Sequence, residues 1–153
     1  MKLQVQPNRW SCFATSVAMV LDIPLDKFFR LVGHDGSENI WPNKKDPHRR
    51  RGIHPQEAML ACAKLGYSMV PLERNPFVMD YDPGACEICH CKRIKVIQAP
   101  FDHLLPLTQG VMRFGSHAVA WDGKNIFDPN GTVRMLHDLP DQYFWISENH
   151  FKF

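Results

Sequence analysis

The first part of the chain carries apolar residues at helical spacing. In the range Cys12–Leu21, the apolar positions that share one face are Phe13, Val17, Val20 and Leu21. A recurrence near 3.6 residues predicts a helix, and Ser11 directly before it is a favoured N-cap residue. Pro24 lacks the N–H that a helix interior needs, so we expect the helix to end before it.

Two more helices are predicted by the same reasoning. The range Leu25–Val32 has one apolar face and stops at Gly33, a common helix terminator. The range Pro55–Leu65 opens with a proline, whose fixed φ suits a first helical turn, and is followed by Gly66.

The second half of the chain is patterned as short strands. The ranges expected to form strands are Tyr67–Leu72, Lys92–Gln98, Gly110–Phe114, His117–Trp121, Ile126–Asp128 and Tyr143–Ile146. The polar stretch Asp122–Asn125 predicts a turn that joins its flanking strands into a hairpin. Helices first and strands afterwards indicate an α+β fold with an antiparallel sheet.

Length and composition bound the class of protein. The 153 residues suit a single domain, 1–153, with loop insertions expected at 33–52 and 75–91. A hydrophobic fraction of 44% and a charged fraction of 22% are typical of soluble globular proteins. The net charge of +2 gives no argument for nucleic acid, and the basic run Lys44–Arg51 is interpreted as a solvated loop.

The sequence contains no signal that would direct it to a membrane or out of the cell. No apolar run reaches the roughly 18 residues of a membrane span, and the range Met1–Gln6 is not a signal peptide. We therefore expect a cytoplasmic protein. Five cysteines is an odd number, and in that compartment it favours free thiols with a catalytic or metal-binding role over a disulfide framework.

Cys12 stands at the first turn of the first predicted helix. Unpaired backbone N–H groups and the helix dipole favour negative charge there, which promotes the thiolate form. A thiolate is a strong nucleophile toward a carbonyl carbon. The alternative is a cysteine that packs as a small buried hydrophobe.

Gln6 precedes Cys12 across a turn at Pro7. A carboxamide donates a hydrogen bond without trapping an ion, so Gln6 and the backbone N–H of Cys12 are candidates for an oxyanion hole. Gln4 is a second candidate, at a longer spacing. The alternative is that both glutamines are exposed polar residues.

A candidate base and a partner for it lie in the predicted hairpin. Among the eight histidines, only His117 begins a clear apolar strand, which would fix its ring as a general base requires. In that hairpin Val119 faces Asp128, one diagonal step from His117. The Asp128 carboxylate would then hold the imidazole in one tautomer. The alternative is that Asp128 only begins a turn.

These residues, taken in order, resemble a known family, the papain-like cysteine peptidases of the bacteriocin-processing leader-peptidase type. The residues that carry the likeness are Gln6, Cys12, His117, Asp128 and Pro129. The likeness covers Gln6–Ser16 and Ser116–Gly131. It implies a papain-like fold, with N-terminal helices packed on a C-terminal sheet, and cleavage of peptide bonds, often after a Gly-Gly pair. Similar stand-alone chains occur in bacteria and phages.

The chain also departs from that family's pattern. The family's nucleophile is often preceded by Asp and followed by Gly, whereas Ser11 and Phe13 flank Cys12 here. Phe13 is expected to crowd one side of the site. The family is usually fused to an export transporter, and this sequence contains none. The implied reaction is acyl transfer through a Cys12 thioester, with a protein or peptide as substrate and no required cofactor.

The remaining cysteines suggest two further roles. Cys62 falls inside the third predicted helix, where core packing is expected. The possible ligands of a structural zinc ion are Cys86, Cys89, Cys91 and either His103 or His90. A Cys-x-x-Cys pair can present two thiolates to one tetrahedral Zn²⁺, and a redox pair or unligated loop thiols are the alternatives.

The leading hypothesis from the sequence is a cysteine peptidase or isopeptidase with Cys12, His117, Asp128 and Gln6 as its site. One rival is a papain-like binding module without turnover. A second is a transamidase or deamidase with the same residues, since amines compete with water for a thioester. A third is a zinc-dependent interaction protein. The substrate and the oligomeric state are left open.

Overall fold

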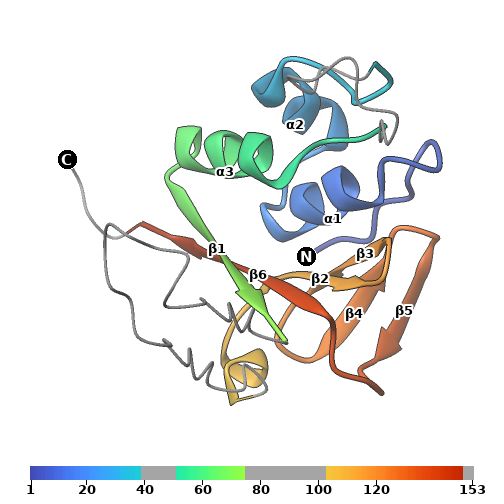
Figure 1. Cartoon of the computed structure of the whole chain (residues 1–153), viewed down its shortest axis with the longest axis vertical. Helices are drawn as coiled ribbons and strands as arrows, with labels where there is room; N and C mark the ends of the chain where they lie inside the picture. The colour runs from blue at the N-terminus through green and yellow to red at the C-terminus, as the bar shows by residue number, and fades with distance from the viewer. Residues whose placement is uncertain (39–50, 75–102, 150–153) are drawn as a thin grey trace, which may run out of the picture.

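The computed structural model describes residues 1–38, 51–74 and 103–149 (Figure 1). The helices are α1 (Cys12–Val20), α2 (Leu25–Val32) and α3 (Pro55–Lys64). The strands are β1 (Tyr67–Glu73), β2 (Gly110–Phe114), β3 (His117–Trp121), β4 (Asn125–Asp128), β5 (Thr132–Met135) and β6 (Gln142–Glu148), with a short 3-10 turn, η2 (Leu105–Leu107), before β2. The predicted α+β class is confirmed. The predicted strand Lys92–Gln98 lies outside the described residues.

The strands form one antiparallel sheet in the order β1-β6-β2-β3-β4-β5. The final strand, β6, therefore inserts between β1 and β2, so strands from both halves of the described chain share one sheet. β5, which the hydrophobic pattern did not indicate, forms the edge beyond β4. All four of its residues are exposed, so it lacks the apolar alternation on which the strand predictions relied.

The β3–β4 hairpin has the predicted register over a short length. Ala120 pairs with Phe127 and Trp121 with Ile126. The expected pairing of Val119 with Asp128 is wrong, because the ladder stops at Ala120 and Asp128 pairs instead with Thr132 of β5.

The helices cover one face of the sheet (Figure 1). Ala118 and Ala120 of β3 share a buried cluster with Val17 of α1, and their small side chains let the helix lie close to the strand. The residues that alternate with them along the strand, Val119 and Trp121, belong to a second cluster on the other face. The alternation of β3 therefore separates two hydrophobic layers and fixes α1 across this strand.

The helix ends show where the sequence signals succeed and fail. Gly33 ends α2 in the left-handed conformation, with φ +99°, as expected for a terminating glycine. Ser11 occupies the N-cap position of α1, but its side chain does not cap the helix. Its hydroxyl donates instead to Asn8 Oδ1 at 2.6 Å. Within the described segments, no helix combines the length and apolar character needed to cross a bilayer.

Candidate functional site

Cys12 is the first residue of α1, and its side chain is largely covered. Its sulfur lies 4.0 Å from the carbonyl oxygen of Ser116, the residue that precedes β3. Because α1 packs across β3, two segments far apart in the sequence meet here. The backbone N–H of Cys12 belongs to the first helical turn and so has no acceptor within the helix.

The ring of His117 is hydrogen-bonded to Asp128. Nε2 of the imidazole lies 2.9 Å from Oδ1 of the carboxylate, and the two side chains are 34% and 10% exposed. The same Oδ1 accepts the backbone N–H of Asn130 at 2.9 Å. Asp128 therefore begins a turn and orients the ring at once, so the two alternatives considered for it are compatible. A neutral ring that donates through Nε2 keeps its lone pair on Nδ1.

Gln6 is held against the turn that follows Asp128. Its backbone N–H donates to the carbonyl of Pro129 at 2.9 Å, and its side-chain Nε2 donates to Asn130 Oδ1 at 3.4 Å. Its Oε1 is buried and has no hydrogen-bond partner among the described residues. The amide is therefore anchored beside Asp128 through Asn130.

Three of the four predicted residues are thus linked by hydrogen bonds, and Cys12 adjoins them through Ser116. Within the described part of the chain, the sulfur of Cys12 is hydrogen-bonded to the Ser116 carbonyl and not to the His117 ring. The carbonyl that this sulfur contacts belongs to the residue directly before His117.

Gln4, the second glutamine candidate, has a different role. Its Nε2 donates to the carbonyl of Ile23 at 2.8 Å, and its Oε1 accepts the N–H of Leu25 at 3.0 Å. Both bonds tie the N-terminal segment to the start of α2. The side chain thus contributes to that junction through one N–H of Nε2 and through Oε1.

Asn130 is the residue of this site that the sequence analysis missed. It joins Gln6 to Asp128, through its side chain on one side and its backbone on the other. The available signal was the Asp-Pro-Asn-Gly turn, since Asn in such a turn often bonds neighbouring groups. The expectation that Phe13 crowds one side of the site stays a prediction. Its ring packs edge-on against Phe144, with ring centroids 5.1 Å apart, in the buried cluster that also contains Cys12.

Of the other cysteines, the structure describes Cys62. Cys62 is fully buried, and burial raises the pKa of its thiol to about 12, which confirms core packing. The proposed zinc ligands Cys86, Cys89, Cys91 and His90 lie outside the described residues. His103 is described and exposed. In the ranges that the structure covers, no three His, Cys, Asp or Glu residues form a group able to hold a metal, and the zinc hypothesis stays a prediction.

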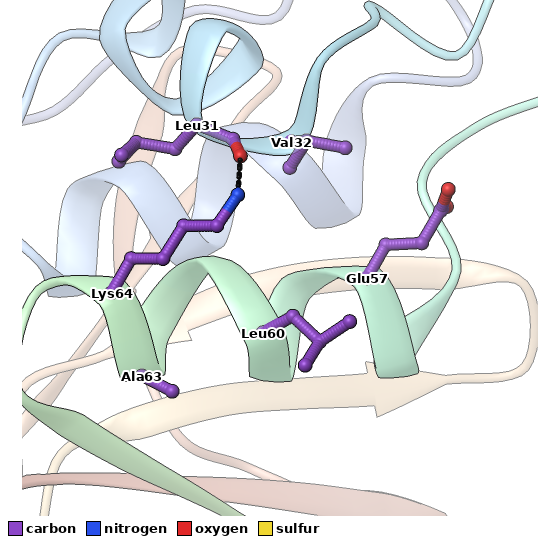
Figure 2. A pocket seen from close by; sticks show the side chains of 6 residues that line it. All are labelled: Leu31, Val32, Glu57, Leu60, Ala63 and Lys64. Carbon is purple, nitrogen blue, oxygen red and sulfur yellow. Dashed lines mark hydrogen bonds between the residues drawn. The ribbon is translucent and has the colours of Figure 1, made fainter.

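A groove between α2 and α3 lies apart from these residues (Figure 2). Its lining residues are Leu31, Val32, Glu57, Leu60, Ala63 and Lys64. The ammonium of Lys64 donates to the carbonyl of Leu31 at 2.8 Å, which satisfies one of the free carbonyls at the end of α2. This groove is thus a helix–helix junction with a structural hydrogen bond.

Comparison with known proteins leaves the chain unassigned. No protein-family model, curated protein or solved structure matches it. A function therefore has to be inferred from the geometry around Cys12 and His117.

Proposed function

We propose that the protein is a papain-like cysteine hydrolase that cleaves a peptide or isopeptide bond through a thioester on Cys12. The observation that carries the proposal is the 2.9 Å hydrogen bond between His117 Nε2 and Asp128 Oδ1. With Nε2 bonded to Asp128, Nδ1 is the basic atom of the His117 ring. His117 directly follows Ser116, whose carbonyl oxygen accepts from the Cys12 thiol.

The first step is proton transfer from the Cys12 thiol to Nδ1 of His117. The thiol turns from the Ser116 carbonyl toward the ring, and the resulting imidazolium stays hydrogen-bonded to the Asp128 carboxylate. A charge-assisted hydrogen bond of this kind stabilises the ion pair. The thiolate then attacks the substrate carbonyl carbon, forming a C–S bond and moving the carbonyl π electrons onto oxygen.

The oxyanion is stabilised by the backbone N–H of Cys12 and by the Gln6 amide. In the present orientation Nε2 of Gln6 faces Asn130, while the buried Oε1 has no donor among the described residues. If both amides turn by 180°, Asn130 Nδ2 donates to Gln6 Oε1, and Gln6 Nε2 takes the buried position that Oε1 holds now. An oxyanion bound there would be the acceptor of that N–H, which is the donor that an oxyanion hole needs.

The tetrahedral intermediate collapses with cleavage of the C–N bond, and the His117 imidazolium gives its proton to the leaving amine. His117 then takes a proton from water, which attacks the thioester and releases the acid and the Cys12 thiol. The groups required at each stage are a nucleophile, a base and a donor. Cys12, His117 and Gln6 can supply them.

A small activated ester tests this assignment without knowledge of the peptide specificity. With p-nitrophenyl acetate, the wild-type chain should release a burst of nitrophenolate and carry an acetyl group on Cys12, as seen by peptide mass spectrometry. Cys12→Ala and His117→Ala should lose the burst, while Cys62→Ala should keep it. A burst that survives Cys12→Ala would refute the proposal.

Peptide-bond cleavage needs its own measurement. A mixture of unfolded polypeptides incubated with the wild-type chain should gain new termini that are missing with Cys12→Ala. An ester burst without any new termini would favour a thioester that passes to amines. An added primary amine should then appear in a covalent product if the thioester passes to amines. If it does not, the acyl group should remain on Cys12.

A further inference from the structure

The turn between β2 and β3 is held by a residue outside the proposed site. Asp141, just before β6, accepts the backbone N–H of Gly115 through its Oδ2 at 2.7 Å. Gly115 and Ser116 are the two residues that connect the strands, and Ser116 presents the carbonyl under the Cys12 sulfur. The next residue is His117, so any movement of this turn moves the proposed base.

Two side chains restrain this turn in addition to its own hairpin geometry. Gly115 has a positive φ of +59°, which suits the first position of a two-residue hairpin loop. Glycine also leaves the backbone freer to rearrange than any other residue. Arg113 adds a second restraint, since its guanidinium donates to the Gly115 carbonyl at 3.5 Å. Asp141 therefore makes the shorter of two side-chain hydrogen bonds to the backbone of Gly115 among the described residues.

Asp141 is itself positioned from both sides. Its backbone N–H donates to the carbonyl of Arg113 at 2.8 Å, and its carbonyl accepts the N–H of Arg74 at 2.9 Å. These bonds fasten its main chain to β2 and to the end of β1. Its carboxylate therefore accepts from the turn while its main chain is held in the sheet.

We propose that Asp141 is a positioning residue for the base, holding the Gly115–Ser116 turn so that His117 meets both Asp128 and the Cys12 thiol. The expected effect on the reactivity of Cys12 rests on the proposed function. The placement of the His117 ring by Asp141 does not depend on that function. The required property of residue 141 is an acceptor oxygen at the correct position, and an amide oxygen can meet that requirement.

The test compares Asp141→Ala with Asp141→Asn, and uses Asp122→Ala as a matched control. Asp122 also accepts backbone N–H groups in a turn of β3, from Lys124 and Asn125, but at the opposite end of the strand. Asp141→Ala should slow alkylation of Cys12 by iodoacetamide at pH about 7 by roughly tenfold or more, since small displacements of reacting groups are costly. Asp141→Asn should restore a rate close to wild type, and Asp122→Ala should leave it unchanged.

The ring nitrogen signals of His117 give a second readout by NMR. In Asp141→Ala the signal of the Nε2 proton bonded to Asp128 should weaken or disappear, and in Asp141→Asn it should persist. An unchanged signal and alkylation rate in Asp141→Ala would overturn the inference, as would an Asp141→Asn variant as impaired as the alanine variant. If wild-type Cys12 reacts no faster than in His117→Ala, the proposed function fails, while the ring signals still decide the role of Asp141.

Discussion

His117 Nε2 lies 2.9 Å from Asp128 Oδ1, although the hydrogen-bonded ladder between their strands ends before Asp128. The two side chains therefore meet beyond the last paired residues, where Asp128 has already turned to pair with β5. The contact depends on the turn at Asn130, which donates to the same carboxylate oxygen. The turn after β4 is consequently part of the candidate site.

The first prediction concerns the acceptor at position 128. Asp128→Ala should reduce the nitrophenyl ester burst rate by about a hundredfold or more, because the base His117 loses the acceptor that holds its ring and tautomer. Asp128→Asn should fall between wild type and Asp128→Ala, because its amide oxygen can still accept from His117 but cannot offset the imidazolium charge. Equal burst rates in all three chains would show that the hydrogen bond has no part in the reaction.

The second prediction separates the two glutamines. Gln6→Ala should lower the kcat of p-nitrophenyl acetate hydrolysis by about a hundredfold, with a smaller change in KM. Removal of one oxyanion-hole donor has an effect of that size in other enzymes. Gln4→Ala is the matched control, because among the described residues that side chain bonds to Leu25 at the start of α2 and to Ile23. It should lower the melting temperature and leave kcat unchanged. The assignment would be reversed if Gln4→Ala were the variant that loses kcat.

The third prediction follows from the buried thiol of Cys62. Burial raises its pKa from the ordinary value of 9.0 to about 12. The folded state retains a proton that the unfolded chain releases, so this contribution to stability is complete below pH about 9 and is lost as the pH rises toward 12. The free energy of unfolding of wild type, measured with urea, should therefore fall as the pH rises across this window. In Cys62→Ala it should fall less steeply.

The control for that series is the free energy of unfolding at pH about 7. There Cys62→Ala should cost only about 1 kcal/mol, the cost of a small cavity. Burial also raises the pKa of Tyr143 to about 12, so some alkaline loss of stability should persist in the variant. Parallel pH dependences in the two chains would contradict the assigned cause.

The fourth prediction tests the packing of the sheet. A Cβ atom added at Gly110 would lie 2.1 Å from the carbonyl oxygen of Phe144, where β2 and β6 run side by side. Because that neighbour is backbone, it cannot move aside without breaking the strand pairing. Gly110→Ala should therefore destabilise the fold by roughly 3 kcal/mol or more, within the range of severe overpacking. Thermal unfolding close to wild type would show that the strands can separate here.

The sequence predicted the local elements better than their partners. The bounds of α2, β2 and β3 are as expected, because strong apolar periodicity or alternation and nearby glycines define them. The insertion of β6 between β1 and β2 was not predicted, since strand order depends on contacts between distant segments. β5 was missed because a fully exposed edge strand needs no apolar face.

The candidate site shows the same division. Cys12 at a helix start and His117 at a strand start could be placed from sequence, and the hydrogen bond from His117 to Asp128 agrees with the predicted proximity. The turn sequence was the one signal for Asn130, and the hydrogen bond of Asp141 to Gly115 could not be foreseen. Both residues act through backbone groups of turns, whose geometry depends on how the sheet is assembled.

The most direct test of the account is the rate of Cys12 alkylation by iodoacetamide at pH about 7 in wild type and in His117→Ala. If the thiol can transfer its proton to His117, wild-type Cys12 should react roughly tenfold or more faster than Cys12 of His117→Ala, because the thiolate is the reacting form. Equal rates in the two chains would contradict a shared site for the sulfur and the imidazole.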